Sequence, residues 1–178
     1  MRRLLEAIGG DGAKAARDRA IIRLLWDLGL RRGEVVSLDL EHLDEERGRL
    51  AVLGKRRSGR EWETLPPESL AALRSWIGRR GSEPGPLFTN LDRAGKGSRL
   101  TTTSIYRMVR ARGRAAGVEV RPHGIRHSAI TTVLDLSGGN VRAAQRFSRH
   151  KDLATLLRYD DSREDLAGQM ARLAAAAL

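Results

Sequence analysis

Apolar residues recur at helical spacing along most of this chain of 178 residues. In residues 20–30, AIIRLLWDLGL, they repeat every three or four positions, and Gly29 stands where a helix is expected to end. The same pattern predicts helices near residues 18–29, 67–80, 101–116, 123–137, 140–148, 152–158 and 162–177. Strands are expected within residues 40–65, on either side of a basic turn that contains glycine. The chain is therefore predicted to be mainly α-helical with a small antiparallel β-sheet, an α+β fold.

The predicted helices also indicate which side chains form the core. Apolar residues that share one face of a helix are expected to pack inward. These are Ala71, Leu73, Trp76, Ile77, Ile105, Val109, Ile130, Val133, Leu134 and Leu136. A chain of this length suits one hydrophobic core, so we expect a single domain over residues 1–178.

The chain is strongly basic, with a formal net charge of +11 and a sequence pI near 11.2. A basic surface binds nucleic acid because binding releases the counterions of the phosphates. The basic runs at residues 55–60 and 107–117 supply candidate contacts. Arginine-rich usage also fits a biased genome, so charge alone does not decide the partner. Aromatic residues make up only 4% of the chain, which argues against a single-strand binder that stacks bases.

Composition excludes several other kinds of site. The chain has no cysteine, which excludes disulfides and thiolate metal sites. No group of histidines and carboxylates shows metal-ligand spacing along the sequence, so we expect no metal and no cofactor. There is no signal peptide and no apolar run of membrane-spanning length. We therefore expect no membrane partner and a cytoplasmic, nucleoid-associated location.

Two segments carry cations that suit a phosphate ligand. Arg31, in GLRRGE, falls at a junction between two helices, and Glu34 lies three residues further on. The planar guanidinium of arginine binds two phosphate oxygens at once. Lys55 lies in the hairpin loop KRRSG, from which it can reach a DNA groove or a leaving oxygen. Each of these cations, taken alone, is more often a solvated surface residue.

Two further segments add histidines, an arginine and a tyrosine. In RPHGIRH, Pro122 suits the first turn of a helix, which places His123 and Arg126 on one face of that helix. This face lies at the helix N-terminus, where an anion is favoured. His150 precedes a short predicted helix that ends at Tyr159, one of two tyrosines in the chain. An amphipathic surface helix with a terminal aromatic is the ordinary alternative for this last segment.

Taken in order, the four segments resemble the catalytic domain of the tyrosine recombinases, the phage integrase family, over residues 1–165. One departure is FSRH, residues 147–150, where the family more often has a Leu-Gly pair before the histidine, a change that should affect loop geometry and not chemistry. Arg31 matches the family's first-box arginine, Glu34 its acidic neighbour and Lys55 the hairpin lysine. His123 and Arg126 match the His-x-x-Arg pair, His150 the last histidine and Tyr159 the nucleophilic tyrosine.

The resemblance implies that the chain cuts and rejoins double-stranded DNA. The two arginines would bind the non-bridging phosphate oxygens, and the two histidines would donate hydrogen bonds or accept the tyrosine proton. Tyr159 would attack the phosphorus, although its ordinary pKa of about 10 requires the clustered cations to ease ionisation. Lys55 would protonate the departing 5′ oxygen. The product would be a 3′-phosphotyrosyl link, formed without ATP or a cofactor.

The expected partners are double-stranded DNA and further copies of this chain. The resemblance implies a tetramer on paired DNA sites and is compatible with a monomer when DNA is absent. The tail, residues 161–178, carries an apolar stripe that we expect to dock either on a neighbouring subunit or on its own domain. The stripe consists of Leu166, Met170, Leu173 and Ala177, and the DNA contacts expected outside the site are Arg56, Arg57, Arg60, Arg107, Arg110 and Arg121.

Two questions of organisation and function stay open at this point. The segment MRRLLEAIGG resembles the first helix of the family's catalytic domain, so we expect a fragment without the family's N-terminal DNA-clamp domain. A naturally short protein is the alternative. Besides a recombinase, the residues also fit a DNA-relaxing enzyme like the type IB topoisomerases, or a DNA-binding module of this fold that no longer cuts.

Overall fold

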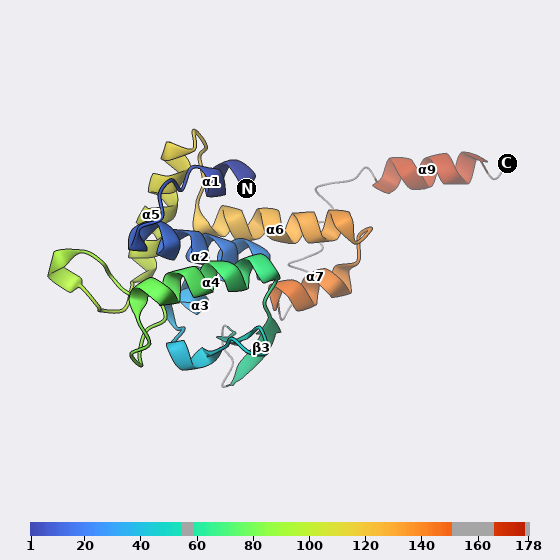
Figure 1. Ribbon diagram of the computed structural model, residues 1–178. Coiled ribbons are helices and arrows are strands. Elements are labelled where there is room, and N and C mark those ends of the chain that lie inside the picture. Colours follow the sequence, from blue (N-terminus) through green and yellow to red (C-terminus); the bar gives the residue numbers. More distant parts are fainter. Residues whose placement is uncertain (55–58, 151–165, 177–178) are drawn as a thin grey trace. The chain divides into compact units, whose positions relative to one another are not determined.

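The computed structural model describes residues 1–54, 59–150 and 166–176, which form helices and one small sheet (Figure 1). They divide into two compact units, Met1–Ala129 and Ile130–Leu178. The predicted fold class, mainly helical with a small antiparallel sheet, is confirmed. The elements are α1 (Arg2–Glu6), α2 (Ala13–Asp27), α3 (Arg32–Val36), η1 (Leu40–His42), β1 (Leu43–Asp44), β2 (Arg49–Leu53), β3 (Arg60–Thr64), α4 (Pro67–Arg80), η2 (Arg93–Gly95), α5 (Thr102–Ala115), α6 (Pro122–Leu136), α7 (Val141–Ser148) and α9 (Leu166–Ala176).

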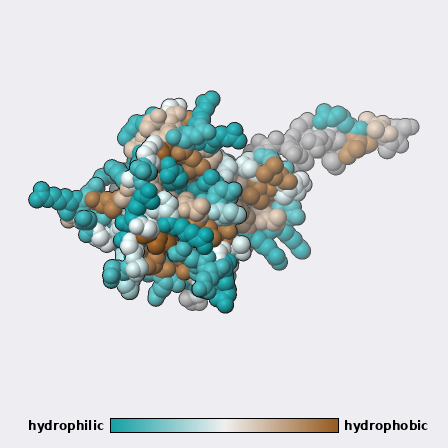
Figure 2. All heavy atoms as spheres, viewed as in Figure 1, coloured by the Kyte–Doolittle hydropathy of each residue, from teal (hydrophilic) through white to brown (hydrophobic). Residues whose placement is uncertain are grey.

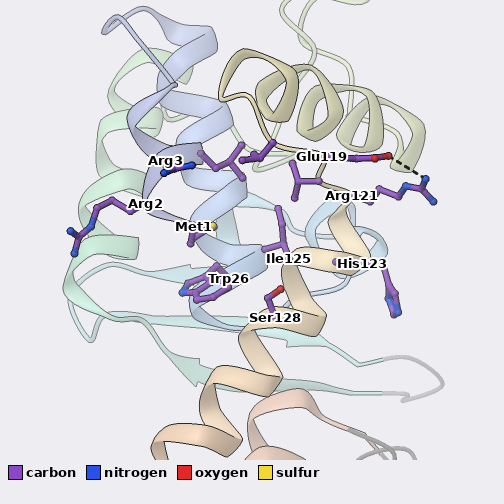
Figure 3. Close-up of a pocket in the computed structure, with 13 residues that line it drawn as sticks. Met1, Arg2, Arg3, Trp26, Glu119, Arg121, His123, Ile125 and Ser128 are labelled. Atoms are coloured by element: carbon purple, nitrogen blue, oxygen red, sulfur yellow. Dashed lines mark ion pairs between the residues drawn. The ribbon is translucent and has the colours of Figure 1, made fainter. Parts of the chain in front are cut away.

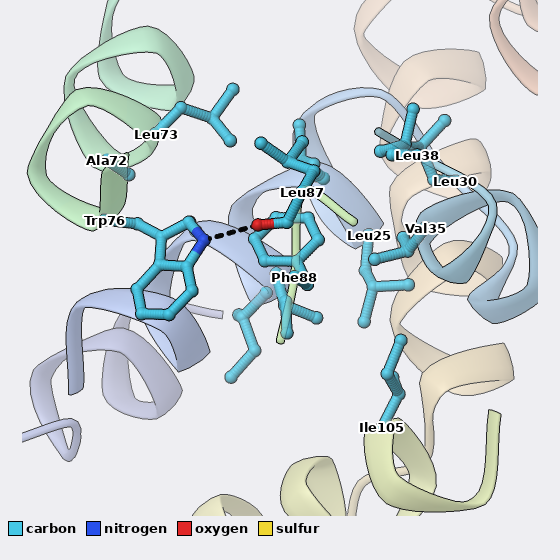
Figure 4. Packing of buried hydrophobic residues seen from close by; sticks show 14 of the residues in the cluster. Leu25, Leu30, Val35, Leu38, Ala72, Leu73, Trp76, Leu87, Phe88 and Ile105 are labelled. Atoms are coloured by element: carbon cyan, nitrogen blue, oxygen red, sulfur yellow. Dashed lines mark hydrogen bonds between the residues drawn. The ribbon is translucent and has the colours of Figure 1, made fainter. Parts of the chain in front are cut away.

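The main core of the unit Met1–Ala129 lies between α2, α4 and the segments around them. Helices α2 and α4 pack side by side, and α2 also contacts α3 and α5 (Figure 1). Trp76 of α4 is fully buried, and its ring stacks on Phe88 with the centroids 6.5 Å apart (Figure 4). The Trp76 indole N–H donates to the Leu87 carbonyl at 2.8 Å. Because burying each large apolar side chain stabilises the fold by roughly 1.5–3 kcal/mol, this core anchors the loops that reach it.

The sheet is antiparallel throughout, in the order β1-β2-β3. Its central strand, β2, is buried over residues 50–52, whereas β3 leaves Trp62 half exposed. The guanidinium of Arg49 covers the Trp62 ring at 4.3 Å from its centroid. At the far end of the hairpin, Leu53 pairs with Arg60. The sheet register therefore fixes the two strand ends from which the basic hairpin loop departs.

A buried ionic cluster joins α2 to α5. Asp18 is inaccessible to solvent and accepts hydrogen bonds from Arg17 at 2.9 and 3.1 Å. It also accepts from Arg112 of α5 at 2.7 and 2.9 Å. Arg17 donates in addition to the Thr89 carbonyl at 3.1 Å. Since a buried carboxylate needs such partners, the cluster holds α5 in register with α2.

The unit Ile130–Leu178 has a smaller core of its own. Helix α7 begins after Asn140, whose side chain accepts a hydrogen bond from the Ala143 N–H at 3.0 Å. In α9, Leu173 is 64% exposed, and it is the only member of the predicted tail stripe whose side chain lies within the described part of the chain. The core consists of Ile130, Leu134 and Ala144, with Val133, Val141 and Phe147 packed against them.

Some boundaries and core positions differ from the prediction. Helix α2 begins at Ala13 and not near residue 18, because its alanine-rich first turn carries no clear apolar period. The five-residue helices α1 and α3 are too short to show such a period. Ala71 is exposed and its neighbour Ala72 is buried, so the prediction was wrong at Ala71, whereas Leu73 and Trp76 of the same helix are buried as predicted. Leu136 is 85% exposed because α6 ends there, beyond the reach of the small core.

The surface of the described residues is mostly polar. Hydrophilic side chains cover much of the face seen in Figure 2, with hydrophobic residues showing between them. Among the described helices, none combines the length and the apolarity that crossing a membrane requires. A phosphate-rich partner fits such a surface better than an apolar one.

Candidate active site

A pocket of about 430 Å³ in the unit Met1–Ala129 brings together three separate parts of the chain. They are the connection from α2 to α3, one face of α5, and the start of α6. Three residues that the sequence analysis predicted to be catalytic, Arg31, His123 and Arg126, line this pocket. We call it the arginine pocket, and its full lining is Leu30, Arg31, Arg32, Tyr106, Arg121, Pro122, His123 and Arg126.

Arg31 is held in place by Glu34, one helical turn away. Arg31 is the N-cap of α3, and its backbone N–H donates to Glu34 Oε2 at 2.8 Å. Its guanidinium Nη1 donates to Oε1 of the same carboxylate at 2.7 Å. Glu34 is buried, with 5% of its surface exposed. One fixed carboxylate therefore caps the helix and orients the guanidinium together.

Arg126 reaches the same connection from α6. It is buried, and its Nη1 donates a hydrogen bond to the backbone carbonyl of Gly29. Gly29 has a φ of 53°, in the left-handed region that glycine adopts without steric penalty. The turn at Gly29 thus accepts from Arg126 and leads within two residues to Arg31. Two arginines that are far apart in the sequence meet at this turn.

The start of α6 contributes two further nitrogen-bearing side chains to the pocket, His123 and Arg121. His123 lies in the first turn of α6 and is exposed to solvent. Arg121 directly precedes the helix, is exposed, and forms an ion pair with Glu119 at 3.5 Å. Among the described residues, the pocket lining holds four guanidinium groups and no carboxylate. Such a concentration of positive charge suits a phosphate group.

Two polar side chains of the arginine pocket, Arg32 and Tyr106, were not predicted from the sequence. Arg32 is exposed at the first position of α3, and the doubled arginine of GLRRGE was the available signal. Tyr106 is partly buried on α5, beside the fully buried Ile105. A tyrosine at helical spacing next to a core residue predicts packing, so no local signal pointed from Tyr106 to the pocket.

Comparison with known proteins identifies the family to which this arrangement belongs. The profile of the phage integrase family matches residues 1–165, more than nine tenths of the chain. The chain belongs to this family. A tyrosine recombinase of Synechococcus elongatus is 43% identical to it over 173 residues, which cover 94% of this chain and 54% of the relative. The predicted resemblance to the tyrosine recombinases is therefore confirmed.

Solved structures of phage integrase family recombinases share the fold. The crystal structure of XerA recombinase matches with a TM-score of 0.75 and 28% identity, over 98% of this chain and 62% of that one. The XerH site-specific recombinase, bound to its difH substrate, matches with a TM-score of 0.76 over 96% of this chain and 50% of that one, at 22% identity. This chain spans about half the length of the tyrosine recombinases that it matches.

The structure does not test the predicted catalytic roles of Lys55, His150 and Tyr159. Lys55 and Tyr159 are outside the described residues, as are the predicted DNA contacts Arg56 and Arg57. His150 is described and belongs to the unit Ile130–Leu178. It follows directly on Arg149, whose φ of 54° ends α7. The catalytic roles of all six residues stay predictions.

The predicted DNA contacts within the described residues have different surroundings. Arg60 donates to the carbonyls of Ser37 at 2.7 Å and Ala51 at 3.3 Å, so it ties the hairpin to the chain after α3. Arg110 donates to Glu119 at 2.7 Å, and this hydrogen bond raises the pKa of Arg110 and lowers that of the Glu119 carboxyl. Arg107 and Arg121 are exposed on α5 and before α6. Contact of these arginines with DNA stays a prediction.

One group of possible metal ligands comes together that the sequence analysis did not identify. Ligand atoms of Asp39, Glu41 and His42 lie within 4.8 Å of one another, because the turn η1 folds them together. His42 Nδ1 accepts the Asp39 backbone N–H at 2.8 Å, and the Asp39 carboxylate is paired with Arg99. Burial, and then the positive charge of Arg60, lower the pKa of His42. The cluster is explained by these internal bonds, which stabilise the turn before the sheet.

Proposed function

We propose that residues 1–178 act as the catalytic domain of a site-specific DNA recombinase, which cuts and rejoins double-stranded DNA through a 3′-phosphotyrosyl intermediate. The observation that carries the proposal is the meeting of Arg31, His123 and Arg126 in one pocket, joined at the Gly29 turn. The identity to a tyrosine recombinase supports it. The structure of XerH with its difH substrate supports double-stranded DNA as the ligand.

In the proposed reaction the arginine pocket binds the scissile phosphate. Arg31 and Arg126 donate hydrogen bonds to the two non-bridging oxygens, and these bonds strengthen as negative charge gathers there during attack. His123 adds a third donor at the exposed side of the pocket. Glu34 acts through Arg31, since its carboxylate fixes the guanidinium before DNA arrives. The pocket then stabilises the transition state without reorganising.

Tyr159 supplies the nucleophile of the proposed reaction. Its phenolic oxygen bonds to the phosphorus while the bond from phosphorus to the 5′ oxygen breaks, and Lys55 protonates that oxygen as it leaves. His150 accepts the tyrosine proton. The phosphotyrosyl ester retains the bond energy of the phosphodiester. Attack by a 5′-hydroxyl therefore reverses the step and rejoins DNA without ATP.

The proposed protein assembles on paired DNA sites as a tetramer and is a monomer without DNA, at the nucleoid in the cytoplasm. Relatives named tyrosine recombinases favour this reading over a relaxing enzyme of the type IB topoisomerase kind. A supercoil-relaxation assay beside a two-site recombination assay separates the two activities. Relaxation without exchange between sites would select the topoisomerase alternative.

Replacing Arg31 or Arg126 by lysine tests the pocket directly. Lysine keeps the positive charge and loses the planar fork, so covalent capture of nicked duplex DNA should slow by about 10²–10³-fold. Binding to intact duplex should change far less, because other cations remain. Since Arg126 is buried, a cooperative melt of each variant must accompany the rates.

Arg74→Lys is the matched control for these two substitutions. Arg74 is exposed on α4 and pairs with Glu45, outside the arginine pocket. Its replacement should leave the capture rate within about twofold of the original, because surface ion pairs contribute little. Folded Arg31→Lys and Arg126→Lys variants that capture DNA at the original rate would contradict the proposed phosphate site.

A further inference from the structure

A second and larger hollow adjoins the arginine pocket. It measures about 990 Å³ and shares Arg121 and His123 with that pocket. Its floor is apolar, with Trp26 of α2 and Ile125 of α6 facing the same space (Figure 3). We call it the Trp26 groove. A ligand whose phosphate occupies the arginine pocket would therefore have an apolar surface directly beside it.

The rim of the Trp26 groove is basic. Arg2 and Arg3 line it from α1, Arg121 lines it from the start of α6, and all three are exposed. Glu119 is the one carboxylate in the lining among the described residues, and it already accepts hydrogen bonds from Arg110 and pairs with Arg121. The rim thus carries an excess of positive charge around an apolar floor. This combination suits a ligand with both phosphates and flat apolar faces.

We propose that the Trp26 groove receives one nucleotide that leaves the base stack next to the scissile phosphate. The inference rests on the proposed function, which places that phosphate in the arginine pocket. Contacts to the duplex backbone alone need cations and no apolar floor, whereas an unstacked base gains from an aromatic and aliphatic surface. A nucleotide held in the Trp26 groove would favour separation of the strand next to the break from its complementary strand.

Helix α9 of this chain fits the groove less well. The described part of α9 carries a single charged residue, Arg172, which has the same sign as the rim. Like charges around one groove oppose docking, whereas nucleotide phosphates are attracted to it. Charge complementarity therefore favours a nucleotide over this helix as the occupant.

The proposal is tested by the ratio of two affinities, one for a duplex with one unpaired nucleotide and one for the same duplex fully paired. We call this ratio the preference for the unpaired nucleotide. The intact chain should bind the duplex with the unpaired nucleotide at least about fivefold more tightly, the lower end of what stacking one base on an aromatic ring supplies. Gly124 lines the groove, and a Cβ atom there meets nothing within 4 Å, so Gly124→Leu adds bulk to the groove without a clash at Cβ. This variant should lose the preference, so the ratio of the two affinities should fall to about one. The affinities are read by fluorescence anisotropy of labelled DNA.

Gly78→Leu is the matched control, since Gly78 is also helical, exposed and open to a side chain, but lies outside the groove. It should keep the preference. Trp26→Leu, which removes the aromatic face, provides the same readout if Gly124→Leu does not melt cooperatively. The proposal would be overturned by a folded groove variant that keeps the preference for the unpaired nucleotide, or by an intact chain that shows no such preference. In either case, binding to the paired duplex would leave the proposed function standing. Failure to bind any duplex would instead refute the proposed function.

Discussion

Replacing Gly113 by alanine should disturb the arginine pocket through a backbone contact. Gly113 lies in the last turns of α5, where residues 118–120 cross it on their way to Arg121 and His123. A Cβ atom there would lie 2.4 Å from Val120 Cγ1 and 2.8 Å from the Val118 carbonyl oxygen. A side-chain rotation can relieve the first contact but not the second. Because the Val118 N–H also donates to the Gly113 carbonyl at 2.9 Å, the segment cannot move away without straining that bond.

The expected loss of stability follows from two opposing effects. Overpacking of this kind costs about 1–3 kcal/mol. The higher helix propensity of alanine returns up to about 1 kcal/mol. We therefore expect Gly113→Ala to lower the free energy of unfolding by up to about 2 kcal/mol, which corresponds to a fall in Tm of up to roughly 8 °C for a chain of this size. Covalent capture of DNA should slow as well, since the displaced segment leads directly into Arg121 and His123.

Thermal melts and capture rates of Gly113→Ala and Gly78→Ala test this reasoning together. Gly78 lies in α4, where a Cβ atom meets nothing within 4 Å. Gly78→Ala should therefore melt at the original temperature or slightly above it, because only the propensity effect remains. If Gly113→Ala melted as high as Gly78→Ala and captured DNA at the original rate, the close packing of residues 118–120 on α5 would be refuted.

Three further results are expected. Cleavage should survive excess EDTA, because in the proposed mechanism guanidinium groups take the place of metal ions at the phosphate, and an absolute need for Mg²⁺ would contradict that mechanism. Duplex affinity should fall on the order of a hundredfold between about 50 and about 200 mM salt, as about four phosphate contacts require, and a flat salt response would count against binding through the backbone. Burial and the positive charge of Arg60 lower the pKa of His42 in the folded chain, although Asp39 and Glu41 act to raise it. Just below pH 6.5, His42 therefore holds a proton in the unfolded chain more often than in the folded chain. Stability should hence rise with pH through that window, and His42→Asn, which keeps an acceptor for the Asp39 N–H, should flatten the rise in urea unfolding curves.

The sequence predicted the long helices because each has a regular apolar face. The prediction for α4, residues 67–80, matches the structure, and its inward face was correct at Leu73 and Trp76 but wrong at Ala71. Leu136 was placed in the core because a period does not reveal where neighbouring elements stop. Tertiary packing decides such ends.

The candidate site also has parts that could be predicted from the sequence and parts that could not. Arg31, His123 and Arg126 were predicted from local motifs, and the structure brings them into one pocket. The contribution of Tyr106 depends on how α5 packs, which no local motif records. The bond from Arg126 to the Gly29 carbonyl joins distant segments and was equally hidden. Local chemistry is readable from a sequence, whereas long-range contacts require the fold.

In the proposed mechanism this chain breaks DNA by forming a bond between Tyr159 and the phosphorus of the strand. Trapping the full chain on a randomised pool of nicked duplexes, followed by protease digestion and mass spectrometry, identifies the residue that carries the nucleotide. We expect a 3′-phosphonucleotide on the peptide that contains Tyr159, and no adduct with Tyr159→Phe. The adduct should persist with Tyr106→Phe, the change at the other tyrosine of the chain. An adduct on any other residue, or one that survives Tyr159→Phe, would contradict the proposed mechanism.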